Sequence, residues 1–156
     1  MSSENTEEKQ ATAKAMQLLL HRQRTEKELR CRLREKEFSP EAVDAAVSYV
    51  ASFGYLDDAR YAEVYLHSMH GRKGRSLIRH ELREKGVSDE LIERAMADEP
   101  DDEEEAVRSL LRRKAGEPHR LEEKEKRRLA AYLTRKGFPL AAVLRQLRLY
   151  QEEGDI

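Results

Sequence analysis

Apolar side chains recur along this chain at intervals of three and four residues, in runs separated by short polar segments. The clearest runs are Val43, Ala46, Val47 and Val50, and later Val143, Leu147 and Tyr150. This spacing places each run on one face of an α-helix. No segment alternates apolar and polar residues convincingly over the length of a strand. The pattern therefore predicts an all-α fold.

Residues that favour helix ends divide this pattern into short helices, the first expected over Glu8–His21. Thr25 followed by Glu28 forms a capping box, and Ser39 followed by Pro40 combines an N-cap with proline at the first helical position. The further predicted starts are Asp57 or Asp58, Ser88, Asp101 and Pro139, and the predicted stops are Gly54, Gly71, Gly86, Gly116 and Gly137.

The helix signals occur in three similar copies. Each copy has two apolar residues spaced by four, then a basic helix end and the start of another helix. The pairs are Leu29 with Leu33, Ile78 with Leu82, and Leu129 with Leu133. The second members are 49 and 51 residues apart, which corresponds to one supersecondary unit for each copy. We predict three tandem repeats of three helices each, at 1–56, 57–100 and 101–156.

Charge is unevenly distributed along the 156 residues, although 30 basic and 31 acidic residues give a net charge of only -1. Residues 98–105 contain seven acids and no base, whereas 106–136 contain eleven bases against four acids. The acidic run is interpreted either as a solvated linker that favours a helix start or as a competitor with DNA for a basic surface.

The basic segment 71–86 is the strongest candidate binding surface. Its six bases are Arg72 and Lys73 in a glycine loop, Arg75, Arg79 and Arg83 at every fourth position of a predicted helix, and Lys85. A stripe of this kind can be only a solvated face, but its continuation into a basic loop favours a polyanionic partner. Because the segment lacks aromatic residues, we expect contact with phosphate or acidic protein rather than base reading. A second candidate combines Arg112–Lys114 with Lys124–Arg128.

No catalytic or metal-binding pattern is evident. His67 and His70 share a face of a predicted helix, but the sequence indicates no third ligand. The single cysteine, Cys31, is interpreted as a small apolar residue on or beside the core face of its helix. Walker A, G-x-G-x-x-G and H-E-x-x-H motifs are absent. We therefore expect a binding protein without enzyme activity, metal or cofactor.

The chain also lacks sequence features of secretion or membrane insertion. No apolar run approaches the roughly 20 residues of a membrane span, and residues 1–14 are polar. A single cysteine excludes an intramolecular disulfide. We expect a cytoplasmic monomer with no membrane association.

Several separated motifs resemble those of one known protein family. The run from Phe53 to Val87, FGYLDDARYAEVYLHSMHGRKGRSLIRHELREKGV, is similar to the central signature of the RecX family of recombinase regulators. The pieces TEKELRCRLREKEFSPEAV and LAAYLTRKGFPLAAVLRQL are similar to its first and third parts. The resemblance implies an elongated, curved array of three three-helix repeats that binds RecA–DNA filaments. It further implies inhibition of filament extension, ATP hydrolysis and strand exchange, with basic surfaces contacting single- or double-stranded DNA.

One position departs from the repeat pattern. Glu37 stands where the later repeats have Gly86 and Gly137. A glutamate in a left-handed helix terminus costs on the order of 1 kcal/mol. We therefore expect the second helix of the first repeat to end differently.

The segment Tyr55–Asp58 allows a structural and a functional interpretation. In the structural one, Leu56 packs near Tyr61 and an aspartate caps the next helix. In the functional one, Asp57, Asp58 and Arg60 contact a partner.

A second function class also fits part of the chain. The helices over 75–97 resemble an independent helix-turn-helix-like nucleic-acid-binding module. A scaffold that binds only protein is a third interpretation. We favour the filament regulator because the family resemblance spans all three repeats, whereas the helix-turn-helix interpretation uses one.

Overall fold

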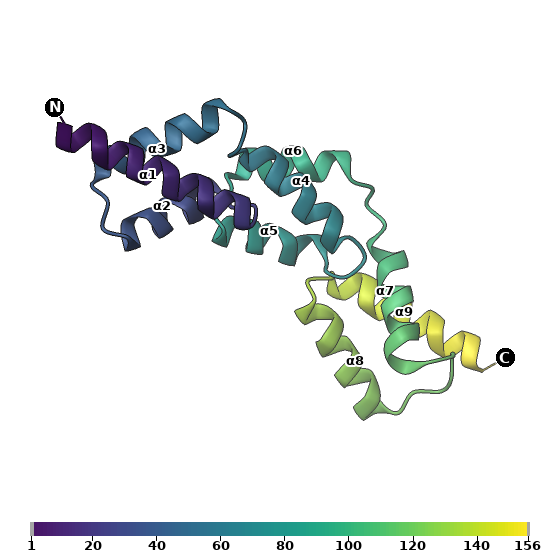
Figure 1. Cartoon of the computed structure of the whole chain (residues 1–156). Helices are drawn as coiled ribbons and strands as arrows, with labels where there is room; N and C mark the ends of the chain where they lie inside the picture. The colour runs from purple at the N-terminus through teal and green to yellow at the C-terminus, as the bar shows by residue number, and fades with distance from the viewer. Residues whose placement is uncertain (1, 156) are drawn as a thin grey trace. The chain divides into compact units, whose positions relative to one another are not determined.

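A computed structural model describes residues 2–155, and this part of the chain forms nine α-helices and no β-strand (Figure 1). The helices are α1 (Ser2–His21), α2 (Glu26–Glu35), α3 (Pro40–Ser52), α4 (Asp58–Met69), α5 (Arg75–Glu84), α6 (Asp89–Asp98), α7 (Glu103–Ala115), α8 (Glu123–Arg135) and α9 (Leu140–Gly154). The predicted all-α fold is confirmed, and the helices follow one another in three sets of three.

The chain packs as two compact units. Unit 1 runs through residue 64 and adds 82–95, and unit 2 consists of 65–81 and the chain from 96 onward. Helices α4, α5 and α6 therefore each contribute residues to both units. The repeat boundaries at 56/57 and 100/101 remain a prediction, because the units do not coincide with the repeats.

The core of unit 1 lies where α1, α2 and α3 meet. Its buried members are Ala11, Ala15, Leu18, Leu29, Leu33, Ala42, Val43, Ala46, Val47, Val50 and Leu56. The expected apolar face of α3 is thus confirmed. Much of this core consists of small side chains, because α1 and α3 contribute alanines to it. Small side chains allow two helices to approach closely.

The core of unit 2 is built mainly by α7, α8 and α9. Its buried members are Val107, Leu110, Leu111, Leu121, Leu129, Leu133, Phe138, Val143, Leu147 and Tyr150. The predicted inward positions on α9 are confirmed.

Most predicted helix ends are confirmed. Thr25 and Glu28 form the capping box, with Glu28 N–H donating to Thr25 Oγ1 at 3.1 Å and Thr25 N–H donating to Glu28 Oε1 at 3.0 Å. The N–H of Ala42 donates to Ser39 Oγ at 3.2 Å. Ser88 caps α6 through the N–H of Leu91, at 3.4 Å.

Two predicted helix starts are wrong. Helix α1 begins at Ser2 rather than Glu8, and Glu7 in the added turn accepts a hydrogen bond of 2.6 Å from the Ser39 N–H, which ties this turn to α3. Helix α7 begins at Glu103 rather than at Asp101. Its N-cap, Asp102, makes no capping hydrogen bond because its carboxylate instead contacts His70 Nε2 at 3.0 Å.

The expected core position of Cys31 is also wrong, because its side chain is exposed. Leu29 and Leu33 define the buried face of α2. Cys31 lies two residues from each of them, about 200° around the helix, so it points to solvent.

The second helices of successive repeats meet end to end in two equivalent joints. In unit 1, Thr25 Oγ1 at the start of α2 donates to the Lys85 carbonyl at the end of α5, at 2.5 Å. In unit 2, the Gly74 N–H before α5 donates to the Lys136 carbonyl at the end of α8, at 2.6 Å. Each joint sets the negative end of one helix dipole against the positive end of another, which is favourable.

Glycine is required after α5 and α8 because these joints leave no room for a side chain. Gly86 and Gly137 have φ of 95° and 93°, a conformation that L side chains rarely adopt. A Cβ at Gly86 would lie 2.3 Å from Lys27 Cβ, and one at Gly137 would lie 2.4 Å from Leu77 Cβ.

The expectation that α2 ends differently is wrong. Glu37 adopts the same left-handed conformation, with φ of 66°, and the Phe38 N–H reaches back to the Leu33 carbonyl at 3.4 Å. The equivalent bonds, Val87 to Leu82 and Phe138 to Leu133, close α5 and α8. Because position 37 is exposed, the Glu37 side chain meets no neighbouring helix, unlike a side chain at position 86 or 137. Its only cost is the strain of the left-handed backbone.

Glu37→Gly should raise the free energy of unfolding by about 0.5–1 kcal/mol, because relief of left-handed strain exceeds the added entropy of the unfolded glycine. Urea denaturation at an unchanged m-value measures the gain. Glu37→Ala is the control, since it removes the carboxylate but keeps the strained Cβ. Equal stability of the glycine and alanine variants would contradict this account.

Candidate partner-binding surface

Helix α5 carries the arginine stripe beside a buried apolar face. Ile78 and Leu82 are 1% and 0% exposed, as their spacing predicts. Arg75 and Arg79 belong to unit 2 and are half-buried, whereas Arg83 belongs to unit 1 and is exposed. The stripe therefore contains side chains in different surroundings.

Arg75 supports the fold of unit 2. Its guanidinium donates to the Met96 carbonyl at 2.8 Å and to the Glu99 carbonyl at 3.5 Å, and its backbone N–H donates to Glu103 Oε2 at 3.2 Å. Burial raises the pKa of Glu103, although the hydrogen bond from Arg75 opposes that shift. Removal of the Arg75 side chain should therefore destabilise unit 2, because its guanidinium satisfies carbonyls at the end of α6.

The glycine loop between α4 and α5 holds one paired and one free cation. Lys73 Nζ contacts both carboxylate oxygens of Glu81, at 2.7 and 2.8 Å, and the Tyr65 hydroxyl donates to the same carboxylate. Arg72 is exposed, and none of the described side chains of residues 5–155 forms an ion pair or hydrogen bond with its guanidinium. Arg72 is therefore the cation of this loop best placed to meet a partner.

The remaining basic residues of the segment lie near the joint in unit 1. Arg83 Nε contacts Asp89 Oδ1 at 2.5 Å, and this hydrogen bond raises the pKa of Arg83. Lys85 is half-buried, and its carbonyl accepts the joint hydrogen bond from Thr25.

The acidic run 98–105 is not simply a solvated linker, because three of its carboxylates contact basic side chains of unit 2 and a fourth accepts a backbone N–H. Glu99 lies 3.5 Å from His67 and 3.7 Å from His70, and Asp102 lies 3.0 Å from the other nitrogen of His70. Glu103 accepts from the Arg75 N–H, and Glu104 pairs with Arg145 at 2.8 Å. Competition of this run with DNA remains a prediction.

The two histidines that share a face of α4 are thus placed against carboxylates. His70 lies between two acidic side chains, while His67 is largely exposed. Within residues 5–155, whose side chains the structure describes, no group of three or more His, Cys, Asp and Glu side chains has an arrangement suited to a metal ion.

The segment before α4 fulfils its predicted structural role. Asp57 Oδ1 accepts from the Arg60 N–H at 3.1 Å and caps α4, and Leu56 is buried in the core of unit 1. Asp58 Oδ1 accepts from the Glu26 N–H at 2.9 Å, and burial raises the pKa of this carboxyl. The Arg60 side chain is exposed, and within the described chain it has no ion-pair partner.

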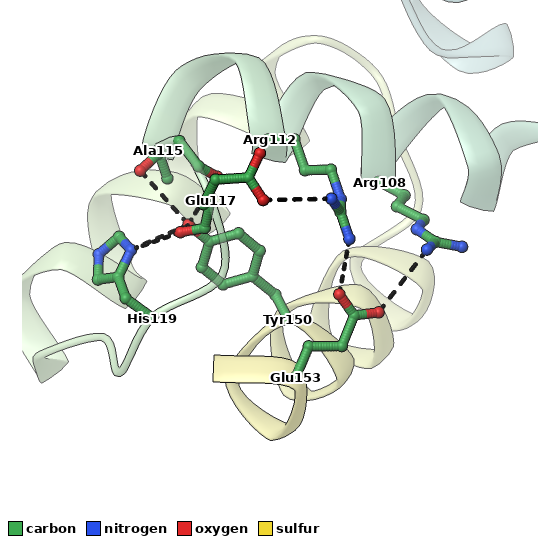
Figure 2. A network of polar contacts seen from close by, with 8 residues as sticks. Arg108, Arg112, Ala115, Glu117, His119, Tyr150 and Glu153 are labelled. Atoms are coloured by element: carbon green, nitrogen blue, oxygen red, sulfur yellow. Dashed lines mark hydrogen bonds and ion pairs between the residues drawn. The ribbon is translucent and has the colours of Figure 1, made fainter. Parts of the chain in front are cut away.

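The second candidate segment is divided between neutralised and free cations. Figure 2 shows Arg108 and Arg112 of α7 reaching Glu153 of α9, at 3.7 and 2.6 Å. On α8, the exposed side chains of Lys124, Arg127 and Arg128 form no ion pair with any described side chain, those of residues 5–155. Helix α8 therefore presents several uncompensated positive charges.

Tyr150 anchors the loop between α7 and α8, a role that its apolar spacing did not indicate. Its hydroxyl lies 3.3, 3.0 and 2.8 Å from the carbonyl oxygens of Ala115, Gly116 and Glu117, and 3.1 Å from His119 Nδ1 (Figure 2). Burial raises the pKa of Tyr150. The hydroxyl has a single proton to donate, and the carbonyls within its reach follow the end of α7, where backbone carbonyls have no partner within the helix.

Comparison with known proteins accounts for the threefold pattern. Residues 11–49, 57–96 and 101–147 match the first, second and third three-helix domains of RecX, in that order. The chain belongs to the RecX family. Its three tandem three-helix repeats are therefore those of RecX, which confirms the predicted organisation.

RecX relatives match over most of their length. The regulatory protein RecX of Amycolatopsis mediterranei is 34% identical over 95% of this chain and 89% of its own. The regulatory protein RecX of a Mycobacterium species is 36% identical over 91% of this chain and 82% of its own. The crystal structure of RecX from Lactobacillus salivarius shares the fold, with a TM-score of 0.78, 21% identity and coverage of 94% and 97%. The chain is thus a member of a family of regulatory proteins.

A membrane-spanning role has no structural support in the described residues. Across 2–155, every helix is too short or too polar to cross a bilayer.

Proposed function

We propose that this RecX-family chain binds filaments of the RecA recombinase on DNA and inhibits their extension. Slower ATP hydrolysis and strand exchange follow, because both depend on the assembled filament. The observation that carries this proposal is the match to RecX across all three repeats in the same order. A regulator that used a single helix-turn-helix unit would not need the other two.

The charge distribution of unit 2 supports contact with a polyanionic assembly. Arg72 in the α4–α5 loop and Lys124, Arg127 and Arg128 on α8 are exposed cations that have no ion-pair partner among the side chains the structure describes. Free cations meet phosphate or carboxylate groups without first breaking an internal ion pair. We propose that the binding site comprises the six basic residues of segment 71–86, with Arg75 also supporting the fold. They are Arg72, Lys73, Arg75, Arg79, Arg83 and Lys85.

Substoichiometric protein should suppress DNA-dependent ATP hydrolysis by the cognate RecA, because one blocked filament end excludes many later subunits. The measurement adds the protein to growing filaments on single-stranded DNA with free recombinase present. At one regulator for about ten recombinase subunits, we expect the rate to fall at least twofold. An unchanged rate at equimolar protein would overturn the proposal.

The helix-turn-helix alternative is separated by a binding comparison. A filament regulator binds recombinase-coated DNA more tightly than bare single- or double-stranded DNA at physiological salt. An independent nucleic-acid-binding module prefers the bare DNA, since coating covers its ligand. Equal or tighter binding to bare DNA would favour the alternative.

A further inference from the structure

A buried arginine in unit 1 has unused hydrogen-bonding capacity. Arg24 is 6% exposed, and its Nε donates to the Leu18 carbonyl at 3.3 Å. Among the side chains of residues 5–155, no hydrogen-bond or ion-pair partner contacts its two terminal nitrogens. Every fully buried side-chain nitrogen of the described residues has a hydrogen-bond partner. Because the two terminal nitrogens of Arg24 have none, they are not fully buried and reach open space. Burial and the neighbouring Arg22 lower the pKa of Arg24, so an anion there would relieve an unfavourable environment.

The open space next to Arg24 is a pocket of about 240 Å³. Met16, Leu19, Leu20 and Tyr61 give it apolar walls, and Arg60 adds an exposed cation. Among the described lining residues only Asp57 is acidic, and its Oδ1 already accepts from the Arg60 N–H. The pocket thus combines apolar walls with two guanidinium groups.

An exposed aromatic cluster continues from this pocket. Tyr55 lines the pocket, and its ring centroid lies 6.4 Å from that of Phe53, which lies 5.0 Å from that of Tyr49. The three residues are 55%, 61% and 51% exposed, and Leu20 at the pocket edge is 79% exposed. Exposed aromatic and aliphatic side chains grouped in this way are typical of protein–protein contact surfaces.

We propose that this pocket binds an acidic residue of a protein partner, with an apolar neighbour of that residue lying on the Tyr55–Phe53–Tyr49 surface. The carboxylate pairs with the terminal nitrogens of Arg24, the geometry in which guanidinium recognises carboxylate best. A protein segment fits better than nucleic acid, because the pocket offers one exposed cation and one carboxylate, whereas phosphate backbones need several exposed cations. The inference does not depend on the identity of the partner proposed above.

Two capped tetrapeptides provide matched probes: acetyl-Gly-Phe-Glu-Gly-amide and the same peptide with Gln in place of Glu. The full chain, labelled with ¹⁵N, is titrated with each while the Nε–H signal of Arg24 and the amide signals of Phe53 and Tyr55 are followed. We expect saturable shifts with the Glu peptide and at least tenfold weaker binding of the Gln peptide, because a charge-assisted bidentate pair is lost.

Variants locate the contact and provide its control. Arg24→Gln should weaken Glu-peptide binding about tenfold, and Arg60→Gln, at an exposed position, by a smaller factor of about three. Arg34→Gln is the control, since Arg34 is exposed and does not line the pocket. It should leave the affinity unchanged.

Several outcomes would overturn the inference. Equal binding of the two peptides by the parent protein excludes carboxylate recognition, and this result does not require any variant to fold. Full affinity in a folded Arg24→Gln variant excludes the proposed contact. Shifts of the same signals by a ten-nucleotide thymidine oligomer at lower concentration than the Glu peptide would assign the surface to nucleic acid.

Discussion

Gly137→Ala should lower the free energy of unfolding by about 3 kcal/mol, a large fraction of the stability of a small protein. The new Cβ would lie 2.4 Å from Leu77 Cβ and 2.7 Å from the Leu77 backbone nitrogen. The left-handed backbone, with φ of 93°, adds strain of about 1–2 kcal/mol. The joint between α5 and α8 must open, which breaks the hydrogen bond from Gly74 to Lys136.

Two further alanine variants separate the clash from the strain. Gly116→Ala has the same kind of strain, with φ of 85°, but its Cβ would meet nothing within 4 Å, so we expect a loss of only about 1 kcal/mol. Gly74→Ala places a Cβ 2.2 Å from the Gly137 carbonyl carbon, so it should be as damaging as Gly137→Ala. Thermal and urea unfolding measure all three variants. Equal losses at 116 and 137 would contradict the importance of the joint.

Arg72→Glu combined with Arg79→Glu should weaken binding to RecA-coated single-stranded DNA at least tenfold, which corresponds to about 1.4 kcal/mol. This pair spares Arg75, whose contacts with the Met96 and Glu99 carbonyls maintain the fold. If both arginines meet phosphate, the salt slope of binding should fall by about 1.4. If they meet acidic side chains of the recombinase, affinity should fall by a similar factor whatever the DNA sequence.

The controls for this experiment carry equal changes of charge. Arg32→Glu with Arg94→Glu replaces two exposed arginines that pair with Glu35 and Glu90, and should have little effect on binding. Arg127→Glu with Arg128→Glu tests the uncompensated cations of α8. A folded Arg72/Arg79 variant with parental affinity, together with a weak Arg127/Arg128 variant, would move the binding site to α8.

Signals carried by neighbouring residues were sufficient to predict most of the helices. The capping box at Thr25, the Ser39–Pro40 start and the apolar spacing on α3 act within one helix, so the chain specifies them without its neighbours. The start of α7 was misplaced for the opposite reason. Asp102 has the chemistry of an N-cap, but His70, 32 residues earlier, engages its carboxylate.

The candidate binding surface was also predictable only where its features depend on neighbouring residues in the sequence. The spacing of Arg75, Arg79 and Arg83 was visible in the sequence, but the free and bound cations were not distinguishable there. Lys73 and Arg75 are occupied by Glu81 and by carbonyls at the end of α6. Arg24 directly precedes the capping Thr25, and nothing in its sequence context indicates burial. The structure shows that it is buried and lines a pocket together with residues of α1 and the start of α4.

By itself, the sequence determined the helical class, the threefold repeat and the core faces, because each depends on residue preferences and periodicities of three to four positions. Tertiary structure alone decided why Gly86 and Gly137 need glycine while Glu37 tolerates the same left-handed backbone. A residue alone sets the cost of its own φ, but the cost of its Cβ depends on what packs against it. At positions 86 and 137 that neighbour is the start of another second helix, and at position 37 it is solvent.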